Sequence, residues 1–336
     1  MASHANRTKW VNGRRRNKDT GLIISLSRPI SAQRASRLWK DCVYEKGKNH
    51  YNCYILWFST PELSTEPQLM NVTAFSIIFS LISLPLHSED AVAPQSSDWH
   101  GYEKLDFAVA GHAGLIVKPK APAAGQPWIW RTEFFGHEPQ ADLSLLAAGW
   151  HVAYYQVSDM YGAPPAIDLM MKFHAHVTNA YGLSQRVVLE GFSRGGLYAV
   201  NFAAAHPDKT AGLYLDAPVL DIRSWPGGKG AGKGDASCWS QALKIYGLTE
   251  ETAATFKGNP LDQLEPLAKA RVPIISVVGD ADTAVPLPEN TAILEKRYKE
   301  MGGKIEVIVK PGVDHHPHSL KDPKPIVDFL MNNALR

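Results

Sequence analysis

The sequence is poor in cysteine and carries little net charge. Only three of its 336 residues are cysteine, and after Cys42 and Cys53 only Cys238 remains. The region that holds Cys238 therefore cannot form an internal disulfide. The formal net charge is +2, and 45% of the residues are hydrophobic. A chain of this length and composition can bury one sizeable α/β domain with additional segments.

The few excess charges are unevenly distributed. Residues 1–69 hold 12 Lys and Arg against 5 Asp and Glu, whereas the remainder holds 23 against 28. The mildly acidic remainder excludes nucleic acid as an expected partner, because phosphates attract basic surfaces. We expect residues 1–69 to be a basic, disordered extension. A nucleic-acid or membrane-surface arm is the alternative for this extension.

An apolar stretch at residues 70–86 is too short to span a bilayer comfortably. It has the length of the apolar part of a secretory signal and is followed by a polar segment, although no Lys or Arg follows Met70. We expect translation to start at Met70, residues 70–93 to be signal-peptide-like, and residues 1–69 to be absent from the native protein. The domain at 94–336 is then exported to the periplasm or outside the cell, without stable membrane insertion. A membrane anchor with a cytoplasmic leader is the alternative.

The sequence Gly191-Phe192-Ser193-Arg194-Gly195 lies between an apolar run at 186–190 and a plausible helix at 196–206. A strand, G-x-S-x-G and a helix form the setting of a nucleophile elbow. Glycines two residues either side of the serine remove clashes in that tight turn. Ser193 is the candidate nucleophile, and the backbone N–H of Arg194 is the candidate oxyanion donor. Taken alone, the pentapeptide fits a glycine-rich turn equally well.

Two further apolar runs, at 272–278 and 304–309, end in residues able to complete a catalytic set. Buried parallel strands read as such runs, and ligands bind beyond their carboxyl ends. The G-x-x-D-x-x-V-P spacing favours Asp282 over Asp280 as the acid, with two turn-forming aspartates as the alternative. Three histidines follow the last run, His315, His316 and His318, and imidazole suits a general base.

The same histidines also fit an exposed loop or a metal site. Adjacent loop histidines rarely converge in tetrahedral geometry, so we expect no metal. Residues 227–233 fit G-x-x-x-x-G-K, but Gly234 replaces the hydroxyl residue of a phosphate-binding loop and no strand directly precedes them. We therefore expect no cofactor.

The order Ser193, Asp282, His315 is the order that α/β-hydrolases use. Residues from about 102 to 335 resemble the α/β-hydrolase superfamily, and most of all the branch of dienelactone hydrolases and prolyl oligopeptidase catalytic domains. The resemblance rests on G-F-S-R-G at 191–195, G-D-A-D-T-A-V-P at 279–286 and P-G-V-D-H at 311–315. In that branch the histidine follows P-G-x-x, which selects His315 over its neighbours.

Alternating strand and helix patterns agree with an α/β-hydrolase fold. We expect a mostly parallel sheet of about eight strands, helices on both faces, and a lid insertion at about 217–262. The expected strands are 105–110, 113–117, 126–130, 150–157, 186–190, 211–216, 272–278 and 304–309. The expected helices are 139–148, 166–181, 196–206, 287–301 and 325–335.

The lipase H-G-G-G sequence is absent, so the second oxyanion donor is sought at the end of the strand at 126–130. We place it at the backbone N–H of Thr132, with that of Arg131 as the alternative. Arg131, Trp225 and Trp239 are the expected substrate-binding residues, the tryptophans as stacking surfaces on the lid. A structural pairing of Arg131 with Glu133 is the other interpretation.

These residues predict a serine hydrolase that cleaves carboxylic esters through an acyl-enzyme, with small-molecule or acylated carbohydrate esters as substrates. A serine peptidase of the prolyl-oligopeptidase type is the first alternative. The short region before the domain disfavours it, because those peptidases usually carry a large propeller. A non-enzymatic binding protein on the same fold is the second.

Overall fold

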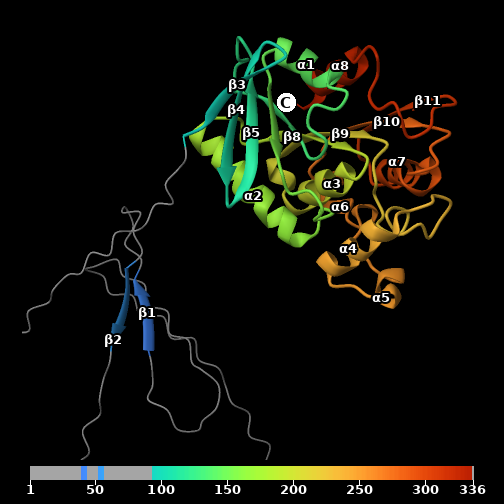
Figure 1. Cartoon of the computed structure of the whole chain (residues 1–336), viewed down its shortest axis with the longest axis horizontal. Helices are drawn as coiled ribbons and strands as arrows, with labels where there is room; N and C mark the ends of the chain where they lie inside the picture. Colours follow the sequence, from blue (N-terminus) through green and yellow to red (C-terminus); the bar gives the residue numbers. More distant parts are fainter. Residues whose placement is uncertain (1–38, 44–51, 57–92, 335–336) are drawn as a thin grey trace, which may run out of the picture. The chain divides into compact units, whose positions relative to one another are not determined.

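The computed structural model describes residues 39–43, 52–56 and 93–334. The chain divides into two units, residues 1–84 and 85–336. In the first unit, β1 (Trp39–Val43) and β2 (Asn52–Leu56) pair antiparallel (Figure 1). The rest of the predicted basic extension, and residues 70–92 of the predicted signal-like segment, lie outside the described residues.

The second unit is built on a nine-stranded sheet with the order β11-β10-β9-β8-β6-β7-β5-β4-β3. Its strands are β3 (Gln95–Trp99), β4 (Tyr102–Val109), β5 (His112–Lys118), β6 (Trp128–Arg131), β7 (His151–Tyr155), β8 (Val187–Phe192), β9 (Thr210–Asp216), β10 (Ile274–Gly279) and β11 (Ile305–Lys310). All pairings among β6 to β11 are parallel, whereas β3, β4 and β5 pair antiparallel. The predicted mostly parallel sheet is confirmed.

The ninth strand, β3, is the one that the sequence analysis did not predict. Its sequence is polar and its first four residues are exposed. An edge strand pairs on one side only and needs no apolar run, so the pattern that identified the other strands is missing here.

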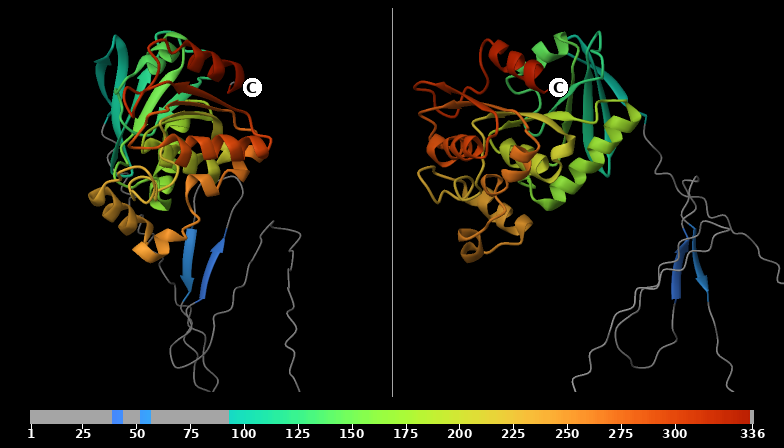
Figure 2. Two further views of the ribbon diagram at one scale, coloured as in Figure 1. Left: turned by 90° about the vertical axis from the view of Figure 1, so that its right-hand side faces the viewer. Right: turned by 180° about the vertical axis from the view of Figure 1, so that it is seen from behind.

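Helices cover both faces of the sheet (Figures 1 and 2). On one face lie α1 (Gln140–Ala147) and α8 (Lys324–Asn333). On the other lie α2 (Pro164–Ala180), α3 (Gly195–Ala205), α6 (Glu265–Lys269) and α7 (Thr291–Glu300). Every helix predicted from the sequence is present, although α7 begins four residues later than expected, behind a short 3₁₀ turn at Leu287–Glu289.

Each central strand contributes to two hydrophobic cores. In β8, Val187 and Leu189 pack into the core beneath α2 and α3, while Val188 packs into the core beneath α1 and α8. All six residues of β8 are buried. Successive side chains point to opposite faces of a strand, so a strand buried on both faces is apolar except where a buried partner pairs a charge, as Arg131 does for Glu190.

The segment predicted as a lid insertion joins β9 to β10 and contains two helices that the sequence analysis did not predict. They are α4 (Ala236–Tyr246) and α5 (Glu250–Ala254), drawn in orange at the end of the unit away from α1 and α8 (Figure 1). Asp235 caps α4 by accepting a hydrogen bond from the Cys238 N–H at 2.7 Å, and Gly247 ends it at a φ of 67°. Closure of this segment over a substrate stays a prediction.

Within the part of the chain that the structure describes, no helix combines the length and the apolar character that crossing a bilayer requires. The thiol of Cys238 is free and half-buried.

Candidate active site

Ser193 lies in a tight turn between β8 and α3. Its φ is 48°, in the left-handed region that side chains other than glycine rarely adopt. The Ser193 N–H donates to the Asp216 carbonyl at 2.9 Å, and its own carbonyl accepts the Val219 N–H at 2.8 Å. A Cβ at Gly191 would lie 3.0 Å from the Ala199 Cβ. The turn therefore has the strained, closely packed geometry expected of a nucleophile elbow.

The structure brings Ser193, His315 and Asp282 together. The Ser193 Oγ lies 2.9 Å from His315 Nε2, and His315 Nδ1 lies 2.8 Å from Asp282 Oδ2. The His315 side chain is 13% exposed and that of Asp282 is 2% exposed. Residues 193, 282 and 315 follow the carboxyl ends of β8, β10 and β11, which meet at one edge of the sheet. The chain order and the spacing thus led to three side chains that form one hydrogen-bonded set.

Asp282 is held by its own loop. Its Oδ1 accepts the N–H groups of Ala284 at 2.9 Å and Val285 at 2.8 Å, which leaves Oδ2 for His315. The alternative acid, Asp280, is exposed and instead accepts the Gly312 N–H at 2.6 Å.

Asp314, the residue before His315, joins the two loops. One of its carboxylate oxygens accepts the Thr283 N–H at 2.7 Å and the His315 N–H at 2.8 Å. These backbone hydrogen bonds, that of Thr283 foremost, lower the pKa of Asp314. Asp314 was not singled out from the sequence, although the P-G-V-D-H motif contains it.

The backbone around the elbow offers two N–H groups for an oxyanion, and Thr132 is not one of them. The Thr132 N–H donates to the Glu190 carbonyl at 2.9 Å, because the pairing of β6 with β8 extends one residue further than expected. The prediction for Thr132 is therefore wrong. Its hydroxyl donates to the Gly195 carbonyl at 2.9 Å and so ties β6 to the elbow. Within residues 93–334, the N–H groups of Glu133 and Arg194 donate no hydrogen bond.

Arg131 does not face a substrate. Its side chain is 1% exposed, with Nη2 at 2.8 Å from Asp142 and 2.9 Å from Glu190. Its Nη1 donates to the carbonyls of Phe134 at 3.0 Å and His137 at 2.7 Å. The predicted substrate-binding role is corrected to a structural one, because the buried guanidinium ties the loop after β6 to carboxylates on α1 and β8. Burial also raises the pKa of Glu190 well above its usual range, against the effect of Arg131.

Glu133 pairs with Arg194 rather than with Arg131. Arg194 Nε lies 3.4 Å from Glu133 Oε1, and the Ser158 hydroxyl donates to Oε2 at 2.9 Å. Burial raises the pKa of Glu133, and Arg194 partly offsets that shift. The Arg194 guanidinium also lies 5.4 Å from the ring centre of Phe134, which is 37% exposed. Phe134 thus supplies an aromatic surface next to the elbow that the sequence analysis missed.

The two predicted stacking tryptophans differ. Trp239 is 7% exposed, packs into the core, and donates its indole N–H to Glu250 at 2.6 Å. Lys229, which lies 3.0 Å from the same carboxylate and 5.5 Å from the Trp239 ring centre, covers it further. The prediction for Trp239 is therefore not supported. Trp225 is half-buried, with its ring centre 6.3 Å from that of Tyr161, and it remains a candidate.

One neighbour of His315, His318, forms a second carboxylate–imidazole pair with Asp216. His316 is exposed, whereas His318 is buried with its Nδ1 at 2.8 Å from Asp216 Oδ1. The other oxygen of Asp216 accepts the Ser319 N–H at 2.8 Å and the Tyr214 hydroxyl at 3.1 Å. This pair fixes the loop after β11 to the end of β9.

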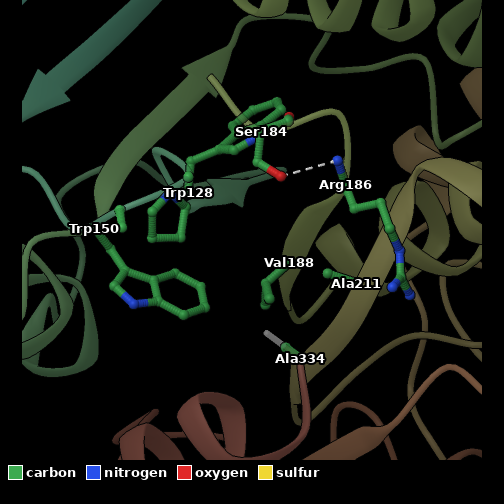
Figure 3. A pocket seen from close by; sticks show the side chains of 10 residues that line it. Trp128, Trp150, Ser184, Arg186, Val188, Ala211 and Ala334 are labelled. Atoms are coloured by element: carbon green, nitrogen blue, oxygen red, sulfur yellow. Dashed lines mark hydrogen bonds between the residues drawn. The ribbon is translucent and has the colours of Figure 1, made fainter. Parts of the chain in front are cut away.

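A cavity of about 400 Å³ lies at the opposite ends of the strands (Figure 3). Trp128, Val188 and Ala211 line it near the starts of β6, β8 and β9. The Arg186 N–H donates to the Ser184 Oγ at 3.2 Å on its wall. Since the triad follows the carboxyl ends of its strands, this cavity has no part in the chemistry at Ser193.

Several solved structures resemble this one in fold. The acylaminoacyl peptidase of Pyrococcus horikoshii matches with a TM-score of 0.54 and 12% identity, over 73% of this chain and 42% of that protein. The dipeptidyl peptidase 4 of Porphyromonas gingivalis matches with a TM-score of 0.53 and 16% identity, over 69% of this chain and 35% of that protein. An S-formylglutathione hydrolase from Agrobacterium tumefaciens matches with a TM-score of 0.53 and 14% identity, over 73% of this chain and 99% of that protein. These matches confirm the α/β-hydrolase fold, and the match spans less than half of either peptidase.

No curated protein sequence matches the chain. The family model described as the prolyl oligopeptidase family, Peptidase_S9, matches residues 150–334. That range is more than half of the chain and contains Ser193, Asp282 and His315. The chain therefore belongs to the prolyl oligopeptidase family, within the α/β-hydrolase superfamily.

Proposed function

We propose that this protein hydrolyses carboxylic esters through an acyl-enzyme formed on Ser193. The observation that carries the proposal is the continuous hydrogen-bonded set from the Ser193 hydroxyl through His315 to Asp282, with distances of 2.9 and 2.8 Å. A serine hydroxyl is a weak nucleophile by itself, and an adjacent imidazole oriented by a carboxylate activates it.

In the first half-reaction the Ser193 Oγ attacks the ester carbonyl, and His315 Nε2 takes the hydroxyl proton. Asp282 holds the proton on Nδ1 and stabilises the imidazolium. The tetrahedral oxyanion receives hydrogen bonds from the N–H groups of Arg194 and Glu133. The imidazolium then gives its proton to the leaving alkoxide, which departs as the alcohol. In the second half-reaction water replaces the alcohol, and the same steps release the acid and restore Ser193.

The assignment of Glu133 as the second donor follows from the position of its backbone. The Glu133 nitrogen lies 3.7 Å from where a Cβ on Gly195 would stand, immediately beside the elbow. The loop that carries this nitrogen is fixed by the buried guanidinium of Arg131. An oxyanion donor has to be preorganised to lower a barrier, and this contact supplies that rigidity.

We propose small-molecule or acylated carbohydrate esters as the substrates. The exposed face of Phe134 and the partly exposed ring of Trp225 are the aromatic surfaces that support a carbohydrate ligand. Arg194 adds a cation beside the nucleophile; its guanidinium is 19% exposed and also pairs with Asp159 at 3.0 Å. Because Glu133 and Asp159 both pair with this guanidinium, the carbohydrate proposal rests on the two aromatic surfaces and not on a free cation.

A serine peptidase is the second candidate, and the match to a peptidase family favours it. The triad and two oxyanion donors are common to both reactions. We favour esters because Glu133, a buried carboxylate beside the elbow, is committed to Arg194 and Ser158 and is 2% exposed. It does not present a free anion to the amino end of a peptide.

A substrate panel tests this proposal. Short p-nitrophenyl esters and aminoacyl-p-nitroanilides are offered to the protein and to Ser193→Ala. Cleavage of esters alone, lost in the variant, supports the esterase, whereas efficient cleavage of anilides supports the peptidase. Cleavage of neither favours a binding protein on the same fold.

We also propose that the domain acts outside the cytoplasm, from the signal-like pattern at 70–86, and that it binds neither nucleic acid nor membrane stably. N-terminal sequencing of the native protein tests the first part, because a start before Met70 contradicts it. Absence of a salt-sensitive shift with added DNA or RNA tests the second.

A further inference from the structure

Three histidines at the end of β11 converge on one point. One ligating nitrogen each of His315, His316 and His318 lies within 4.8 Å of the other two. The ring centres are 4.7 to 5.0 Å apart. The ring of His137 lies near this group, 6.0 Å from His316 and 5.9 Å from His318. Neighbouring loop histidines rarely converge, which is why no metal was expected from the sequence, and here they do converge.

Two of the three imidazoles have the environment that metal ligands usually have. A ligating histidine commonly gives its second ring nitrogen to a carboxylate, which fixes the ring and increases its basicity. His315 Nδ1 lies 2.8 Å from Asp282, and His318 Nδ1 lies 2.8 Å from Asp216. Both carboxylates are buried. In each ring Nε2 is then the nitrogen left for a metal, and on His315 that nitrogen also contacts the Ser193 hydroxyl.

We propose that His315, His316 and His318 bind a divalent cation of the zinc type, with water as the fourth ligand, and that this cation inhibits the enzyme. Imidazole nitrogens suit Zn²⁺, Cu²⁺ and Ni²⁺ and not Mg²⁺, which prefers oxygen. In a tetrahedral site with Zn–N bonds of about 2.0 Å the nitrogens stand about 3.3 Å apart. His316 is exposed and free to supply most of the closing movement.

Inhibition follows from the position of His315 Nε2, which holds the Ser193 Oγ at 2.9 Å. A cation on that nitrogen occupies the lone pair that would accept the serine proton. Each imidazole nitrogen donates its lone pair to the hydrated cation and displaces a bound water, the hydrogen bond from the serine hydroxyl breaks, and no atom changes oxidation state. The inhibition rests on the proposed function, but the cation site itself does not.

Calorimetric titration with Zn²⁺ tests the site without any enzymatic readout. The wild-type protein and Ser193→Ala should each bind one ion, and Ser193→Ala at least as tightly because its hydroxyl no longer competes for His315. Since His316 is a ligand, His316→Asn should raise Kd by about tenfold or more. His100→Asn is the matched control at another exposed histidine, where asparagine tolerates the φ of 53°. It should leave Kd unchanged.

The same four proteins separate the possible failures. Absence of Zn²⁺ binding by wild type and Ser193→Ala, or equal affinity in His316→Asn, overturns the site. If the site exists, Zn²⁺ should inhibit ester hydrolysis by wild type and His100→Asn, a chelator should restore it, and His316→Asn should resist. Binding without inhibition overturns the regulatory part. Failure of the protein to cleave any ester leaves the binding test on Ser193→Ala intact.

Discussion

Two aspartate–histidine pairs lie beside each other at the carboxyl edge of the sheet. The distance from imidazole Nδ1 to carboxylate is 2.8 Å in both His315–Asp282 and His318–Asp216, and the two rings are 4.9 Å apart. The difference is what surrounds them. His315 reaches Ser193 and is 13% exposed, whereas His318 is 2% exposed.

The comparison shows that a carboxylate–imidazole pair does not by itself make a catalytic base. We call His315–Asp282 the outer pair and His318–Asp216 the inner pair. In the outer pair, backbone N–H groups hold one carboxylate oxygen of Asp282, so the other oxygen is left to bind the imidazole of His315. In the inner pair, Asp216 also holds Ser319 and Tyr214, so the pair closes the core. We therefore expect substitutions in the outer pair to change turnover and substitutions in the inner pair to change stability.

The largest effect is expected for Asp282→Asn, which keeps the shape of the outer pair. The amide favours the wrong imidazole tautomer, so kcat should fall by about 10⁴-fold with little change in thermal stability. Steady-state ester hydrolysis with a melting curve measures both. Asp280→Asn, in the same loop, is the control and should keep most of the activity. Equal losses in the two variants would break the assignment of the acid.

Arg131→Met should have the next largest effect, on stability rather than on chemistry alone. It leaves Asp142 and Glu190 buried without their cation, so the free energy of unfolding should fall by about 3–5 kcal/mol. Denaturant titration gives the value. A variant as stable as wild type would show that the guanidinium is not needed to hold the loop after β6.

Asp216→Asn sharpens the contrast between the two pairs directly. It removes one charged acceptor from the inner pair, so the free energy of unfolding should fall by about 1–3 kcal/mol while kcat falls far less than in Asp282→Asn. Unfolding and ester hydrolysis are compared on the same preparation. A loss of kcat as large as that of Asp282→Asn would make the inner pair part of the chemistry.

The smallest effect is expected for Glu190→Gln, and it depends on pH. Burial raises the pKa of Glu190 in the folded protein, so above about pH 4.3 the folded state binds a proton that the unfolded state has released. Stability from this group is therefore lost as pH rises toward the folded pKa. The glutamine variant lacks this titration, so its stability should fall less between pH 5 and 8. An identical pH slope in the two proteins would exclude the raised pKa.

Most of the sheet could be predicted because its central strands are apolar on both faces. The strand β3 was not predicted because an exposed edge strand needs no apolar residues. The helices α4 and α5 were not predicted because they follow a glycine-rich stretch that is typical of a loop. The triad could be predicted because its order and spacing lie in three short motifs.

The surroundings of the triad depend on contacts between distant segments, which the sequence pattern does not show. The predicted oxyanion role of Thr132 is wrong because its N–H donates to the carbonyl of Glu190, 58 residues away. The predicted substrate-binding role of Arg131 is wrong because its partner carboxylates lie on other elements and enclose its side chain. The predicted stacking role of Trp239 is not supported, because the sequence does not show that the face of α4 carrying this residue turns inward.

Labelling with a fluorophosphonate, followed by peptide mass spectrometry, shows whether Ser193 is the activated nucleophile. The reagent reacts with a serine that a neighbouring base has activated. We expect one adduct on the peptide carrying Ser193, much slower labelling in Asp282→Asn, and no labelling in Ser193→Ala. A folded wild-type protein that stays unlabelled, or that carries the adduct on another serine, would contradict this assignment.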